Sequence, residues 1–169
     1  MPRSVVLVSA LALAGCGYHA VHGGAAPSER FAVVLSHGSI PDVVASDEVL
    51  AGVRDSLASA GALSAGEGYP RCEVEVLRAD ETSDGIAAVG GQPVARSTRV
   101  GLVARAWIVR APDGPHERDT GDVRALNEIS ATTDARAASF QYTDALRAAG
   151  RRVGRSLGAH VVGLPSTTE

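Results

Sequence analysis

The sequence predicts an α+β fold, a two-layer sandwich in which two helices pack on one face of a four-stranded mixed sheet. Apolar residues alternate along several short segments, a pattern typical of half-buried strands. Two longer segments instead carry apolar residues at helical spacing. The predicted order is β-α-β-β-β-α. A helix between the first two strands makes that pair parallel if the strands are neighbours, and the short later connections favour antiparallel pairing.

The first strand and the first helix are predicted within residues 31–61. Residues 31–35, FAVVL, form a short apolar run of the kind found in covered strands. Ser46 is the expected cap of the helix that follows, and Gly61 is placed to end it. Apolar residues recur at helical spacing in between, namely Val49, Leu50, Val53 and Leu57. This stripe is expected to lie on the sheet.

The second strand is predicted over residues 72–78, CEVEVLR. Its alternation puts Cys72, Val74 and Val76 on one face and Glu73 and Glu75 on the other. Residues 82–96 follow, with glycines and a proline around a small apolar patch at 86–89. They are predicted to form either a long loop or an extended hairpin tip, and loops of this length are uncommon unless functional or disordered.

The third strand, residues 99–109, has the clearest alternation in the chain. One face is apolar and consists of Val100, Leu102, Ala104, Ala106 and Ile108. The other face is mixed and consists of Arg99, Val103, Arg105, Trp107 and Val109. The single tryptophan therefore lies on the side away from the predicted core.

The last two elements complete the order. Residues 122–130, DVRALNEIS, are predicted to form the fourth strand after a turn at Pro112-Asp113-Gly114. A final helix is predicted from about Thr143 to Val161. Glycines spaced four apart lie along one side of it, and this side is expected to approach the sheet closely: Gly150, Gly154 and Gly158.

The start of the chain has the features of a secretory signal peptide. The apolar run from Val5 to Ala14 follows Arg3 and is too short to cross a bilayer as a helix, which takes about 20 residues. Leu13-Ala14-Gly15-Cys16 resembles the lipobox of bacterial lipoproteins, in which the signal is cut before the cysteine and its thiol is acylated. Cys16 is thus the predicted lipidation site, and several acyl chains such as palmitate would give stable membrane anchoring. The alternative is an ordinary cleaved signal peptide.

The predicted organisation has one folded domain. It comprises a lipoprotein signal peptide at 1–15, a lipid-anchored flexible tether at 16–30, a single α+β domain at 31–165 and a frayed tail at 166–169. The net charge is −3, and loss of Arg3 with the signal leaves 15 basic and 19 acidic side chains, or −4. Such a charge disfavours nucleic-acid binding. Cys72 is predicted to be a small buried side chain, with a reactive thiol as the alternative.

The sequence indicates no catalytic, metal or cofactor site, so we do not expect an enzyme. It contains no nucleophile-elbow, zinc-protease or phosphate-loop motif. The one candidate for catalysis is Ser36-His37, just after the first strand, and adjacency alone does not make a dyad. A polar loop is the favoured interpretation of these two residues.

A partner-binding surface is predicted on the mixed face of the third strand. Helices on one side of a sheet leave the other side open, where Val103, Trp107 and Val109 would form an exposed apolar strip beside Arg105. The alternative is that the tether or the 82–96 segment covers this face. A second contact region, for lipid or partner, is predicted around the hairpin tip and consists of Ile86, Val89, Arg96 and Arg99.

The junction at residues 16–23, CGYHAVHG, resembles the mature start of the LptE-type lipopolysaccharide-assembly lipoproteins. The predicted element order is also similar to theirs. The resemblance implies an outer-membrane, periplasm-facing lipoprotein that binds a β-barrel translocon, LptD, helps it to assemble, and contacts lipopolysaccharide. Gly17, which stands where an aspartate would retain enterobacterial lipoproteins at the inner membrane, implies the same destination. An adaptor of another envelope machine, such as a peptidoglycan-synthase activator, and an anchored hydrolase are the alternatives.

Overall fold

The computed structural model describes residues 29–36, 42–89, 92–130 and 132–165, without the side chains of 84–89 and 92–96. The elements follow the predicted order: β1 (Ala32–Leu35), α1 (Val43–Ser59), β2 (Arg71–Val89), β3 (Gln92–Val109), β4 (Val123–Ser130) and α2 (Ala135–Val161). The predicted signal peptide, most of the tether, and the tail at 166–169 lie outside the described residues. Cys16 and His37 lie outside them as well.

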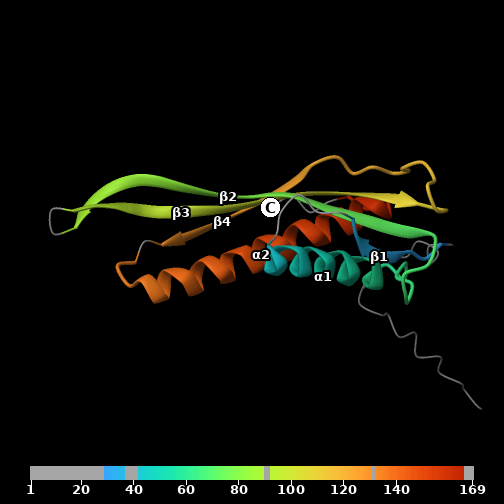
Figure 1. Ribbon diagram of the computed structural model, residues 1–169, viewed down its shortest axis with the longest axis horizontal. Coiled ribbons are helices and arrows are strands. Elements are labelled where there is room, and N and C mark those ends of the chain that lie inside the picture. Colours follow the sequence, from blue (N-terminus) through green and yellow to red (C-terminus); the bar gives the residue numbers. More distant parts are fainter. Residues whose placement is uncertain (1–28, 37–41, 90–91, 131, 166–169) are drawn as a thin grey trace, which may run out of the picture.

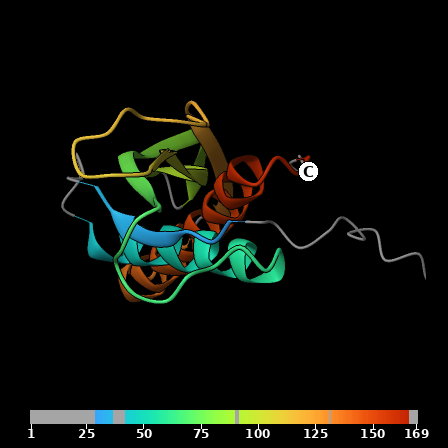
Figure 2. The same cartoon turned by 90° about the vertical axis from the view of Figure 1, so that its right-hand side faces the viewer.

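The four strands form one mixed sheet in the order β1-β2-β3-β4. β1 pairs with β2 in parallel, and the other two pairs are antiparallel. Both helices lie on the same side of the sheet (Figures 1 and 2). The two-layer α+β sandwich predicted from the sequence is therefore confirmed.

The core lies between the helix layer and one face of the sheet. Its largest fully buried side chains come from every layer and include Phe31, Leu57, Leu102, Ile108, Leu146 and Leu157. Cys72 is part of this core with no exposed surface, and burial raises its pKa to about 12. The prediction of a small buried cysteine is confirmed, because such a thiol stays protonated at neutral pH.

The strands β2 and β3 form a hairpin that is longer than the rest of the sheet. β1 pairs only with Arg71–Val74, and β4 pairs only with the stretch of β3 from Ser97 to Ala104. The register between β2 and β3 shifts between Val76 and Arg78, a β-bulge that leaves Leu77 without a partner. Of the two predictions for residues 82–96, the extended hairpin is correct, and its end projects beyond the helices (Figure 1).

Both helices begin earlier than predicted. Asp42, not Ser46, caps α1, where its Oδ1 accepts the N–H of Ala45 at 2.9 Å. α2 begins at Ala135 instead of near Thr143, because the Oδ1 of Asp134 accepts the N–H groups of the next turn. The first turns of α2 carry an exposed Phe140 and no continuous apolar stripe, so periodicity alone missed them.

The glycines of α2 face α1, not the sheet as predicted. A Cβ at Gly158 would lie 2.6 Å from the Cβ of Ser56, and one at Gly52 would lie 2.5 Å from the carbonyl oxygen of Arg151. A Cβ at Gly154 would meet the backbone of Val49, Gly52 and Val53. The missing side chains therefore allow two helix backbones to touch, a contact that does not show in the sequence of either helix alone.

Candidate partner-binding surface

The predicted binding surface is the outer face of the sheet, the face turned away from the helices. Strand pairing puts these residues on it: Arg71, Glu73, Glu75, Arg78, Asp80, Val103, Arg105, Trp107, Val109, Arg124 and Leu126. Val103, Trp107 and Val109 are each only 4% exposed. The expectation of an exposed apolar strip is therefore wrong. Their role in partner binding stays a prediction.

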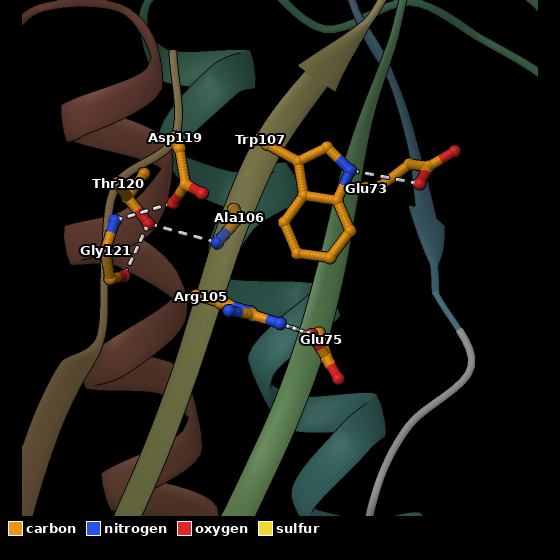
Figure 3. Close-up of polar contacts among 8 residues, drawn as sticks. All are labelled: Glu73, Glu75, Arg105, Ala106, Trp107, Asp119, Thr120 and Gly121. Carbon is orange, nitrogen blue, oxygen red and sulfur yellow. Dashed lines mark hydrogen bonds and ion pairs between the residues drawn. The ribbon is translucent and has the colours of Figure 1, made fainter. Parts of the chain in front are cut away.

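Trp107 contacts a carboxylate, an imidazole ring and a guanidinium. Its indole N–H donates to Oε2 of Glu73 at 3.1 Å, as Figure 3 shows, and Glu73 lies directly opposite it on β2. The ring of His116 stacks on the indole with centroids 4.5 Å apart and planes 15° apart. The guanidinium of Arg105 lies 5.5 Å from the indole centroid. Polar and aromatic groups thus close over the tryptophan.

Both glutamates of β2 on the outer face, Glu73 and Glu75, form ion pairs with arginines. Arg105 donates through Nε to Oε2 of Glu75 at 2.8 Å (Figure 3), and this contact raises the pKa of Arg105. Arg71 pairs with the other oxygen of Glu73, Nη2 to Oε1 at 2.6 Å. Glu73 therefore binds a guanidinium and an indole at once. Direct cross-strand pairs of opposite charge stabilise a sheet by a few tenths of a kcal/mol to about 1 kcal/mol each.

The cover over the outer face comes from the connection between β3 and β4, residues 110–122. The N–H of Thr120 donates to the carbonyl of Ala106 at 2.9 Å, and Oγ1 of Thr120 accepts the N–H of Ala106 at 3.0 Å. Ile108 and Glu117 exchange two further backbone hydrogen bonds. The connection thus continues the pairing of β3 where β4 ends, and it brings His116 onto Trp107. The sequence left a cover from the tether or the 82–96 segment as an alternative; the described part of 82–96 belongs to the hairpin, and the tether before Glu29 lies outside the described residues.

Val103 is buried by a different means. Strand register places it between Arg78 of β2 and Arg124 of β4. Both arginines reach Asp80, Arg78 with Nε to Oδ2 at 3.1 Å and Arg124 with Nη2 to Oδ2 at 4.0 Å. The aliphatic parts of such arginines shield apolar surface while their charged ends stay in water. The outer face is therefore a charged surface above a buried apolar layer.

The predicted site residues end up in three places. Arg105 and Trp107 lie together with Val109 near one end of the outer face, and Arg99 lies exposed toward the hairpin end. Ile86, Val89 and Arg96 belong to the hairpin strands, and their side chains lie outside the described ones. The alternation of residues 72–78 already put Glu73 and Glu75 on this face. No pattern in the sequence indicated His116, because its position depends on the connection.

Of the candidate catalytic pair Ser36-His37, the structure describes only Ser36. Among the described residues, no cluster of three or more histidine, cysteine or acidic side chains could hold a metal ion. An open hollow of about 640 Å³ is lined by exposed or half-buried residues at the end of α2, including Arg118, His160 and Leu164. Ser36 is described, and its N–H donates to the carbonyl of Val74. No helix in the described ranges is long and apolar enough to cross a membrane.

Comparison with known proteins gives only distant similarities. No protein-family model matches the chain, and no curated protein matches it. Among solved structures, a minor lipoprotein from Acinetobacter baumannii is 12% identical with a TM-score of 0.46, covering 78% of this chain and 93% of its own. A putative lipoprotein from Caulobacter crescentus is 10% identical with a TM-score of 0.49, covering 77% and 86%. Rare lipoprotein B from Shewanella oneidensis is 10% identical with a TM-score of 0.43, covering 76% and 94%. These values say nothing of what the present chain binds.

Proposed function

We propose that the chain is an acylated outer-membrane lipoprotein that faces the periplasm and acts by binding, without catalysis. Its proposed partner is an LptD-like β-barrel translocon, which it helps to assemble and to deliver lipopolysaccharide to the outer leaflet. One combined observation carries the proposal: a lipobox-like junction at Cys16 precedes two helices on one face of a four-stranded sheet. The resemblance of residues 16–23 to LptE-type lipoproteins implies the same anchor and the same order of elements.

The ends of the molecule support a division between anchoring and binding. Glu29, the first described residue, forms an ion pair with Arg110, which directly follows β3. The predicted tether therefore joins the domain at the end of the sheet that holds β1, and the hairpin end lies at the opposite end (Figure 1). The hairpin is thus held away from the point where the anchored segment joins. This arrangement suits a hairpin that reaches a partner or lipid through Ile86, Val89, Arg96 and Arg99.

The outer face supports a polar contact with the partner. Arg105 keeps 41% of its side-chain surface exposed. Leu126 of β4 is 43% exposed and lies opposite Gly101, farther along the sheet toward the hairpin. Charged and polar groups across an interface confer specificity and increase the rate of association more than they add affinity. The proposed contact therefore consists of ion pairs exchanged along the outer face, with Leu126 as an exposed apolar contact.

The anchor is tested by replacing the acylated atom. Cys16→Ser, in the full-length chain, is expected to move the protein from the membrane to the soluble periplasmic fraction. The unchanged chain should carry acyl groups on its processed first residue, detected by mass spectrometry. A native protein that is soluble, with an unmodified thiol at its processed end, would contradict the anchor.

The partner is tested by co-purification from outer membranes with an epitope placed after Glu169. We expect a large β-barrel protein to co-purify, and Leu126→Arg on the outer face to reduce its yield strongly. Val43→Arg is the matched control, because Val43 is 69% exposed on the helix side and is also an apolar side chain replaced by arginine. Capture of a peptidoglycan synthase in place of a barrel would instead support the adaptor alternative. Lost envelope function in a Ser36→Ala, His37→Ala double variant with unchanged folding and partner binding would support a hydrolase.

A further inference from the structure

The two terminal strands of the sheet are blocked by arginines. Arg54 of α1 donates through Nη2 to the carbonyl of Val33 in β1 at 3.2 Å. Arg152 of α2 donates through Nη1 to the carbonyl of Leu126 in β4 at 3.0 Å. The ladder directs both carbonyls away from the neighbouring strand, since the adjacent residues form the strand pairs. Short strands and charged side chains at a sheet edge discourage other chains from pairing there.

The edge of β2 from Val76 to Val89 has no such protection among the described residues. Within the described residues, the pairing of β1 reaches Val74, whose carbonyl accepts the N–H of Ser36. No other described segment pairs with this side of β2. The open stretch is longer than the whole of β1, and it runs along the projecting hairpin (Figure 1). A long open edge is a template for an additional strand.

The ladder identifies which main-chain groups face this edge. Ala106 of β3 bonds to Thr120 on the far side, so the odd-numbered residues of β3 are directed toward β2. Their partners Arg78 and Asp80 therefore bond to β3. The alternate residues Ala79, Glu81 and Ser83 direct their N–H and C=O groups to the open edge.

The charged side chains of β2 indicate which charge an added strand should carry. On the helix side of β2, Glu81 is exposed and has no hydrogen bond or ion pair with the described residues. Burial raises the pKa of the nearby Tyr142, and the negative charges of Glu81 and Asp42 raise it further. On the outer side, Arg78 and Arg124 already neutralise Asp80. A second copy of the chain would bring the same unpaired Glu81 to this edge, so charge favours a strand that carries basic side chains on the helix side.

We propose that the free edge of β2 binds an extended strand of another protein, one that carries basic side chains toward Glu81. The strand adds to the sheet in line with β1. This edge is distinct from the outer face of the sheet. The inference rests on the proposed function in one respect, the location of the partner in the outer membrane. Co-purification tests the partner, and variants of the edge test the mode of binding.

The experiment uses the purified full-length chain and a capped peptide, Val-Lys-Val-Lys-Val-Lys-Val, with the corresponding glutamate peptide as the control probe. Residue-resolved hydrogen exchange is measured with and without peptide. We expect the lysine peptide to slow exchange at Ala79, Glu81 and Ser83 by about tenfold or more, and the glutamate peptide to have no effect. Glu81→Arg should reverse this preference. Glu67→Arg, the same change at an exposed position before β2, should leave it unchanged.

A second variant removes a main-chain donor and keeps the charge. Ser83→Pro lacks the outward N–H, and proline is tolerated at strand edges whose N–H faces solvent. It should abolish protection by the lysine peptide while the circular dichroism spectrum is retained, and Glu81→Arg provides the test if this variant fails to fold. Absence of protection at the edge, protection at another surface, or the same amides protected by self-association without peptide would each overturn the inference. Edge protection without a co-purifying barrel would overturn only the proposed function.

Discussion

Replacing Trp107 with alanine tests whether the outer face is closed. The indole is 4% exposed, stacks on His116 and donates to the Glu73 carboxylate. Large-to-small replacement of a buried tryptophan costs about 3–5 kcal/mol. We expect the lower end, about 3 kcal/mol, because His116 is itself exposed and water can refill part of the site.

The assay is urea unfolding of the domain followed by circular dichroism. With an m-value of about 2 kcal/mol per molar, the expected loss lowers the midpoint by about 1.5 M. Trp107→Phe is the matched control, since it keeps an aromatic ring and removes the N–H. It should cost about 1–2 kcal/mol, mainly through the lost hydrogen bond to Glu73. His116→Ala should cost about 0.5–1.5 kcal/mol through the lost stacking.

A double-mutant cycle separates this cluster from general loss of packing. The coupling energy between Trp107→Ala and His116→Ala should be about 0.5–1.5 kcal/mol, because each variant removes the same stacked pair. A loss below about 1 kcal/mol for Trp107→Ala, which is the usual range for surface residues, would refute a closed outer face. Trp107 would then be available as an exposed contact, as the sequence predicted.

Two further predictions concern the core. Gly154→Ala gains about 1 kcal/mol of helix propensity but forces a Cβ against the backbone of α1, so we expect a net loss of about 2 kcal/mol in the free energy of unfolding. Ala148→Gly, at an exposed position of the same helix, measures the effect of helix propensity alone. A Gly154→Ala variant that is more stable than the wild type would show that the helices do not touch there. Cys72 has its pKa raised by burial from 9.0 to about 12, so its thiol contributes stability that is present below pH 9 and lost as the pH rises toward 12. The difference in unfolding free energy between wild type and Cys72→Ala should therefore shrink over this range, and a pH-independent difference would place the thiol in contact with solvent.

Local patterns accounted for most of the secondary structure. The alternation of residues 72–78 and 99–109 identified the central strands and their core faces, and Val123–Ser130 was predicted to within one residue. These predictions held because successive side chains of a strand point to opposite faces. Burial of one face therefore makes apolar residues alternate with polar ones along the strand's own sequence. The starts of the two helices were missed, because a single aspartate side chain set each of them.

The candidate site depended on contacts that no local pattern contains. The alternation correctly placed Arg105 and Trp107 on the outer face together with Glu73 and Glu75. It could not show that they pair, since pairing requires the register between β2 and β3. It also could not show that residues 110–122 return along β3 and bring His116 onto the indole. An exposed strip was therefore predicted where a closed one exists.

The sequence by itself determined the order of elements and the faces of the strands, and it predicts the anchor at Cys16. These properties depend on residues that are near one another in the chain. Only the tertiary structure decided that the glycines of α2 face α1 and that Val103 and Trp107 are covered. It also decided that, among the described residues, no strand pairs with the β2 edge beyond Val74, while Arg54 and Arg152 donate to outward carbonyls of β1 and β4. The physical reason is that burial and hydrogen-bond pairing are properties of two surfaces at once, and which surfaces meet is settled only when the chain is folded.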